Sequence, residues 1–190
     1  KEATSDLAVL ACARLFKEGL NREALDLLIV CTQNPDYKLP NTASIVQDRL
    51  NLPHTIASFD LNQGCSGFIY SLAVAKSMMK VLRFRHAVVI TVDPYSKIID
   101  ENDKNTALLF GDAAAAVWLS SESDNEILDF SFGTDGSGFD KLIVWAGGVR
   151  HSLEASETDS EDGSKDPFLR MNGRAIFNFM MKRVPVDIKR

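Results

Sequence analysis

The sequence predicts an α/β fold in which helices cover both faces of a largely parallel sheet. Apolar strand-like runs alternate with helical patterns through the first half of the chain. These runs lack the period-two alternation of a sheet with one solvent-exposed face. Continuous apolar runs of this kind are typical of parallel strands that are buried on both faces. With 190 residues and 45% hydrophobic content, the chain can form one domain or part of a larger one.

The first half supplies three predicted strands and the helices between them. Residues 3–20 form an amphipathic helix, for which Gly19 is the stop signal. The predicted strands are "LDLLIVCT" (25–32), "TIASFDL" (55–61) and "HAVVITVD" (86–93). Asn41 caps a helix over residues 42–52, and a long helix covers residues 66–81.

The second half is less regular. Residues 106–120 form a strand pair, or one long strand interrupted at Gly111 and Asp112, and strand-like runs follow at 126–136 and 141–148. Residues 149–166 are rich in acids and form a solvated loop. Residues 166–184 return to helix.

The composition excludes several classes of function. A net charge of −5 without a long basic block argues against a nucleic-acid or anionic-membrane partner. The sequence has no apolar run near the roughly 20 residues that span a bilayer, and the first residues lack a signal-peptide pattern. The three cysteines are widely spaced and odd in number, so we expect no disulfide framework and a cytoplasmic location.

One cysteine lies in the short segment between a predicted strand and a predicted helix. Gly64 and Gly67 flank Cys65 and Ser66, and glycine lets a chain turn within one or two residues. The unpaired N–H groups and the dipole of a helix N-terminus favour the thiolate form of a cysteine. A comparable strand–turn–helix presents the nucleophilic serine of other α/β enzymes. Cys65 is therefore a candidate nucleophile, with a small buried packing residue as the alternative.

The other two cysteines, Cys12 and Cys31, lie within apolar patterns and are predicted to be structural.

The segment "DLNQGCSGFIYSLAVA" (60–75) resembles the active-site segment of the β-ketoacyl-acyl carrier protein synthase III family of the thiolase superfamily. Residues 33–53, 102–119 and 168–185 resemble further stretches of that family in the same order. The resemblance implies a thiolase-like fold of layered αβαβα type. It also implies that residues 1–190 are a single incomplete domain, the N-terminal half plus a crossing helix, without the opening strand and the C-terminal half.

The resemblance implies an acyltransferase of fatty acid biosynthesis. Cys65 would take an acyl group from acyl-CoA, and decarboxylation of malonyl-acyl carrier protein would then give a β-ketoacyl product. It further implies a homodimer and a reaction without metal or redox cofactor. The family's catalytic histidine and asparagine lie in the second half, and this chain's His54, His86 and His151 match no family motif. The chain alone is therefore not expected to carry out the condensation.

Two weaker substrate-binding candidates come from the same resemblance. Lys104 aligns with an arginine that contacts the nucleotide end of CoA, although lysine lacks the planar guanidinium fork. Leu39 aligns with a phenylalanine that crosses the dimer interface and closes the partner's acyl pocket. A solvated surface lysine and an ordinary loop-packing leucine are the alternatives for these two positions.

Several further residues are less specific candidates for a role in function. Asn62 and Gln63 could hydrogen-bond the nucleophile, Asp112 could order the backbone of the core, and Arg174, Lys182 and Arg183 could dock an acidic carrier protein or simply form a solvated helix face.

Two other functions remain open. One is a different CoA-thioester enzyme of the thiolase superfamily, acting in head-to-head acyl condensation or like hydroxymethylglutaryl-CoA synthase. The other is a non-catalytic homologue that only dimerises.

Overall fold

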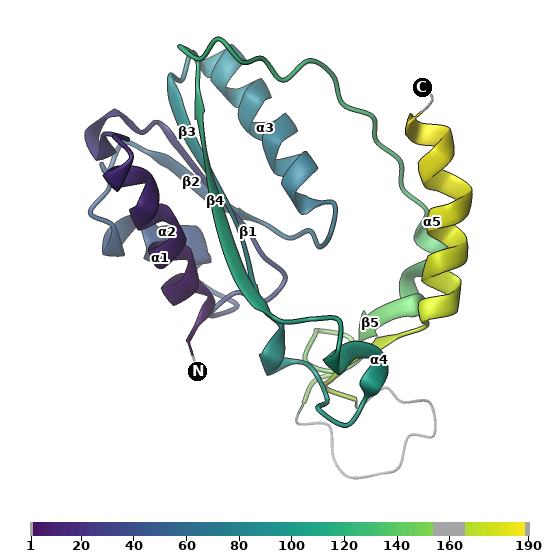
Figure 1. Ribbon diagram of the computed structural model, residues 1–190. Coiled ribbons are helices and arrows are strands. Elements are labelled where there is room, and N and C mark those ends of the chain that lie inside the picture. Colours follow the sequence, from purple (N-terminus) through teal and green to yellow (C-terminus); the bar gives the residue numbers. More distant parts are fainter. Residues whose placement is uncertain (1, 154–165, 189–190) are drawn as a thin grey trace. The chain divides into compact units, whose positions relative to one another are not determined.

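A computed structural model describes residues 2–153 and 166–188 (Figure 1). The chain divides into two compact units, which we call the sheet unit (residues 1–94 and 112–130) and the second unit (residues 95–111 and 131–190). The sheet unit contains α1 (Thr4–Lys17), η1 (Arg22–Ala24), β1 (Leu27–Cys31), α2 (Thr42–Arg49), β2 (Ala57–Leu61), α3 (Gly67–Leu82), β3 (His86–Pro94) and β4 (Asp112–Ser120). The second unit contains η2 (Tyr95–Lys97), α4 (Lys104–Ala107), η3 (Gly136–Lys141), β5 (Leu142–Val144), β6 (Leu169–Met171) and α5 (Gly173–Ile188).

The sheet unit is built on a four-stranded sheet of order β2-β1-β3-β4. The central strand β1 is parallel to both β2 and β3, and β4 runs antiparallel to β3. Cys31 lies opposite Leu61 on one side and Thr91 on the other, so β1 and β2 end at the same level while β3 continues to Pro94. The predicted α/β fold with a largely parallel sheet is confirmed.

Helices bury both faces of this sheet. Helices α1 and α2 pack on one face, and α3 packs on the other (Figure 1). Alternate residues of β1 enter the two cores: Leu28 and Val30 join one, whereas Leu27 and Ile29 join the other. All residues of β1 are buried, which explains why the run shows no polar alternation. Each fully buried aliphatic side chain contributes about 1.5–3 kcal/mol.

Local capping explains where the helices of the sheet unit begin and end. Helix α1 ends before Gly19, whose φ of +106° places it in the left-handed region that favours glycine. At the start of α2 the Asn41 side chain accepts from the N–H of Ser44, as predicted. The Asp60 carboxylate of β2 accepts from the N–H groups of Thr42 and Ala43, both at 2.7 Å. This carboxylate ties α2 to the strand that leads into the cysteine turn.

Three expectations for the second half are wrong. The strand expected over 106–120 begins only at Asp112, because Asp103 caps the short helix α4 by accepting from the N–H of Asn105 at 3.0 Å. The run 126–136 contains no strand. The helix expected over 166–184 starts late, because β6 precedes α5.

Ion pairs fix β6 within the second unit. The Arg170 guanidinium approaches the carboxylates of Asp100, Asp103 and Asp166. Of the acidic loop expected at 149–166, residues 154–165 lie outside the described residues. No helix in the described ranges is long and apolar enough to cross a bilayer. That residues 1–190 make up one incomplete domain stays a prediction.

Candidate active site

Cys65 lies in the turn between β2, which ends at Leu61, and α3, which begins at Gly67. Its side chain is exposed, whereas Cys12 and Cys31 are buried, as expected for structural cysteines. The turn leaves the sheet at the carboxyl ends of the parallel strands. In open α/β sheets this edge is where ligands bind.

The turn is held by backbone hydrogen bonds on either side of the cysteine. The N–H of Gly67 donates to the carbonyl of Gly64 at 2.8 Å, and the N–H of Gln63 donates to the carbonyl of Leu61 at 3.1 Å. In the described part of the chain the N–H of Cys65 donates no hydrogen bond. It is therefore free to donate to an oxygen that develops negative charge next to the thiol.

The two glycines of the turn are needed for close approach and not for unusual backbone angles. The described glycines with positive φ are Gly19 and Gly147, so neither Gly64 nor Gly67 adopts the left-handed backbone conformation. A Cβ at position 67 would lie 2.3 Å from the Cys31 sulfur, and a Cβ at position 64 would lie 2.6 Å from Oε1 of Gln33. The turn therefore packs directly against the end of β1 and the loop that follows it. Nor is Cys65 strained like a nucleophile elbow, since the described non-glycine residues with positive φ are Asn51 and Arg83.

The Cys31 thiol donates to the carbonyl oxygen of Gln63 at 3.4 Å. Burial raises the pKa of the Cys31 thiol, so the sulfur keeps its proton near neutral pH and acts as a donor. Burial also raises the pKa of Cys12, to about 12. Neither buried thiol is suited to nucleophilic attack.

Asp93 orders the loop beside the turn, a role that the sequence reasoning missed. Its Oδ1 accepts from Thr32 Oγ1 at 2.9 Å, from the N–H of Gln33 at 2.8 Å and from the N–H of Asn34 at 3.2 Å. The available signal was an acidic residue at the end of an otherwise apolar strand. Such a carboxylate needs partners, and loop N–H groups supply them.

The other candidate residues are spread over the two units. Leu39 is 87% exposed in the loop between β1 and α2 of the sheet unit. Lys104 is an exposed residue that opens α4 of the second unit. The Gln63 side chain accepts from Ser66 Oγ at 3.5 Å and makes no described hydrogen bond with Cys65.

Asp112 is exposed at the start of β4, and its expected role in ordering the backbone of the core stays a prediction. On α5 the three basic residues Arg174, Lys182 and Arg183 are exposed, and Arg183 pairs with Asp135 at 3.5 Å.

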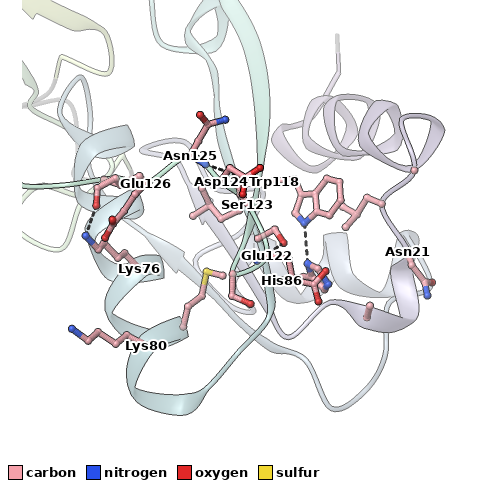
Figure 2. Close-up of a pocket in the computed structure, with 18 residues that line it drawn as sticks. Asn21, Lys76, Lys80, His86, Trp118, Glu122, Ser123, Asp124, Asn125 and Glu126 are labelled. Atoms are coloured by element: carbon pink, nitrogen blue, oxygen red, sulfur yellow. Dashed lines mark hydrogen bonds between the residues drawn. The ribbon is translucent and has the colours of Figure 1, made fainter.

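A cavity of about 1130 Å³ lies at the opposite end of the sheet from Cys65. It is lined by the first residue of β3, His86, and by Trp118 near the end of β4, together with Lys76 and Glu122. The Trp118 indole N–H donates to Nδ1 of His86 at 3.3 Å (Figure 2). None of Cys65, Leu39 and Lys104 lines this cavity. Across the described residues, histidines, cysteines and carboxylates form no cluster that could hold a metal ion.

Comparison with known proteins identifies the chain's relatives. A family model for 3-oxoacyl-(acyl-carrier-protein) synthase III matches residues 59–136, which include the cysteine turn. The β-ketoacyl-(acyl-carrier-protein) synthase III of Streptococcus sanguinis (strain SK36) is 39% identical over 189 residues, covering 99% of this chain and 56% of that protein. This chain is homologous to synthase III.

Solved structures of synthase III share the fold. A crystal structure of a 3-oxoacyl-(acyl-carrier-protein) synthase III matches 100% of this chain and 58% of its own, with a TM-score of 0.90 at 38% identity. That of the Thermus thermophilus synthase III matches 96% of this chain and 54% of its own, with a TM-score of 0.80 at 33% identity. The thiolase-like fold predicted from the resemblance is confirmed. The chain spans only about half the length of the synthase III relatives that it matches.

Proposed function

We propose that Cys65 is the nucleophile of an acyltransferase that condenses an acyl-CoA primer with malonyl-acyl carrier protein. The observation that carries this proposal is the exposed thiol of Cys65, next to the first turn of α3 and within the segment that matches synthase III. The N–H groups in the first turn of a helix have no partners within the helix and favour negative charge close by.

In the first half-reaction the Cys65 sulfur attacks the thioester carbonyl of acyl-CoA. A tetrahedral oxyanion forms, to which the free N–H of Cys65 can donate. Collapse of this intermediate breaks the carbon–sulfur bond to CoA. The CoA thiolate leaves and takes up a proton, and the acyl group remains on Cys65 as a thioester.

In the second half-reaction the malonyl group of the carrier protein loses CO₂. The electron pair of the broken carbon–carbon bond forms an enolate, whose carbon attacks the acyl carbonyl on Cys65. The Cys65 thiolate then leaves, and the product is β-ketoacyl-acyl carrier protein. Donors that polarise the malonyl carbonyl stabilise the enolate, and the proposed sequence needs neither metal ion nor redox cofactor.

The sheet unit offers no histidine beside Cys65 for this second step. His86 begins β3 and His54 precedes β2, so both lie at the amino ends of the parallel strands, whereas Cys65 follows a carboxyl end. A catalytic acid or base must come within hydrogen-bond reach of the reacting group. We therefore propose that this chain alone supports acylation of Cys65 and gives no measurable condensation.

Substrate and partner contacts complete the proposal. Lys104 would contact the nucleotide end of CoA, and exposed Leu39 would reach the acyl pocket of a second subunit in a homodimer. The exposed basic residues of α5, Arg174, Lys182 and Arg183, would meet the acidic carrier protein. The widely spaced cysteines favour a cytoplasmic setting for the reaction.

Acyl transfer to Cys65 can be tested directly by peptide mass spectrometry. The chain is incubated with acyl-CoA and digested, and the Cys65 peptide is examined for the mass of a hydroxylamine-labile acyl group. We expect an acyl group on Cys65 and none in the Cys65→Ala variant. Absence of acylation would reject the proposal and favour a non-catalytic homologue. Added malonyl-acyl carrier protein should leave the acyl group in place, and a β-ketoacyl product from this chain would contradict the second-step argument.

A further inference from the structure

The side chain of Cys31 contacts both ends of the segment that carries Cys65. Cys31 is the last residue of β1 and is only 3% exposed. Its thiol donates to the carbonyl of Gln63, which opens the turn. Its sulfur also lies against Gly67, which opens α3, so closely that a Cβ at position 67 would stand 2.3 Å away.

A second contact comes from the loop that follows β1. The Gln33 side chain occupies the space beside Gly64, where a Cβ would lie 2.6 Å from Oε1. The Gln33 backbone is itself held by Asp93, because its N–H donates to Oδ1 at 2.8 Å. The turn thus packs against the carboxyl end of β1 and the loop that follows it. Of the two residues that contact the turn, Cys31 is the buried one and has the shorter side chain.

We propose that Cys31 is a positioning residue for Cys65 in the acyl transfer proposed above. By holding the Gln63 carbonyl and the first residue of α3, it fixes the direction of the Cys65 thiol and of its N–H. Its own sulfur does not take part, because it is enclosed by the sheet and the turn. This inference rests on the proposed function for its role in catalysis, and on the contacts alone for its effect on the turn.

Removing the sulfur should slow the reaction without weakening substrate binding. In Cys31→Ala the turn loses a hydrogen bond and its packing partner, and misplacement by about 1 Å can cost about 100-fold in rate. We expect the rate constant for acylation of Cys65 to fall about tenfold on the same grounds. The acyl-CoA concentration for half-saturation should stay within about twofold, because buried Cys31 cannot touch CoA. Cys31→Ser, which keeps a donor, should recover most of the rate.

The contact between Cys31 and Gly67 can be tested with a pair of compensating substitutions. Gly67→Ala alone places a methyl group 2.3 Å from the sulfur and 3.1 Å from Cβ of Gln63. In Cys31→Ala/Gly67→Ala the sulfur is gone, and the remaining Cβ of residue 31 lies 3.9 Å from the new methyl group. We expect the double variant to react at least about fivefold faster than Gly67→Ala, since contacting residues show non-additive effects.

The matched control is Cys12→Ala, which removes an equally buried thiol from α1, away from the turn. Two readouts are taken for every variant: the rate of iodoacetamide labelling at Cys65 and the rate of its acylation by acyl-CoA. Thermal unfolding of each variant identifies any chain that fails to fold. If Gly67→Ala does not fold, Cys31→Ala and Cys31→Ser are compared with Cys12→Ala alone.

The outcomes separate this inference from the proposed function. If Cys31→Ala labels and acylates like Cys12→Ala, Cys31 does not position Cys65, while the proposed function stands. If the unmodified chain is never acylated, but Cys65 labelling falls in Cys31→Ala and recovers in Cys31→Ser, the positioning role stands and the proposed function fails.

Discussion

Burial separates the thiol side chains of this chain into one that can react and two that cannot. The pKa of Cys12 is raised to about 12 and that of Cys31 is raised, in both cases chiefly by burial, whereas Cys65 is exposed. At pH 8 we therefore expect iodoacetamide to modify Cys65 before the other two. Peptide mass spectrometry after short labelling times measures the order. Equal labelling of all three cysteines in the folded chain would contradict it.

The raised pKa of Cys12 also predicts how stability depends on pH. Its thiol ionises near the ordinary value of 9.0 in the unfolded chain and only near 12 in the folded chain. The folded state thus keeps a proton that the unfolded state loses, so the contribution is fully present below pH 9 and is lost as pH rises towards 12. We expect the free energy of unfolding in urea to fall over this interval, and to fall less steeply in Cys12→Ala. If the free energy of unfolding falls with the same slope in both chains, groups other than Cys12 cause the loss of stability at alkaline pH.

Leu39 is the position at which primer length can be tested. Its side chain is 87% exposed in the sheet unit, so Leu39→Phe should change stability by no more than about 0.5 kcal/mol. If Leu39 closes a partner's acyl pocket, the larger ring should shift preference to shorter acyl-CoA primers. The measurement is a chain-length series with the protein extended to the length of its relatives. If the preference for primer length is unchanged, Leu39 does not line the acyl pocket.

At the residue scale, the sequence could reveal Cys65 as a candidate but not the contacts that support it. The candidate nucleophile lies in a local motif, and a strand, a turn and a helix can be recognised from neighbouring residues. The contacts of Cys31 with Gln63 and of Asp93 with Gln33 join residues far apart in the chain. Such contacts follow from strand order and register, which the sequence pattern does not specify.

Among the structural elements, α2 depends on a cap that comes from another strand. The Asp60 carboxylate accepts two N–H groups at the start of α2, and a hydrogen bond to a charged group contributes about 1.5–3 kcal/mol. Asp60→Ala should therefore lower the free energy of unfolding by about 2 kcal/mol or more. Asn41→Ala, which removes the local cap, should cost about 1 kcal/mol. Urea unfolding compares the two, and a smaller loss in Asp60→Ala than in Asn41→Ala would contradict the argument.

The sequence predicted correctly the elements that pack on the sheet. It failed for short elements that are fixed by capping or by ion pairs. Strand β1 and helix α3 are long, apolar and packed on the sheet, so their patterns were clear. Residues 108 and 109 are apolar but 84% and 69% exposed, so their apolar character did not indicate a buried strand. Strand β6 has only three residues and is fixed by the ion pairs of Arg170, which no periodicity can reveal.

At the scale of the whole molecule, the edge of the four-stranded sheet is a candidate surface for pairing with a second chain. Strand β2 forms one edge of the four-stranded sheet, and an edge strand is a template for pairing with another chain. We expect the protein extended to the length of its relatives to sediment as a homodimer at micromolar concentration. A monomer at high micromolar concentration would contradict this. The 190-residue chain should associate less specifically, because α5 exposes apolar residues such as Phe177 and Met181.

The contact between the Cys31 sulfur and Gly67 also restricts the order in which these two positions can change over evolutionary time. A side chain at position 67 meets the sulfur at 2.3 Å, so an alanine there is harmful while cysteine stands at 31. Once alanine occupies 31, the same alanine at 67 keeps only the tight 3.1 Å approach to Cβ of Gln63. A lineage that reaches alanine at both positions therefore meets less steric conflict if position 31 changes first, and the effect of one mutation depends on the history of the other.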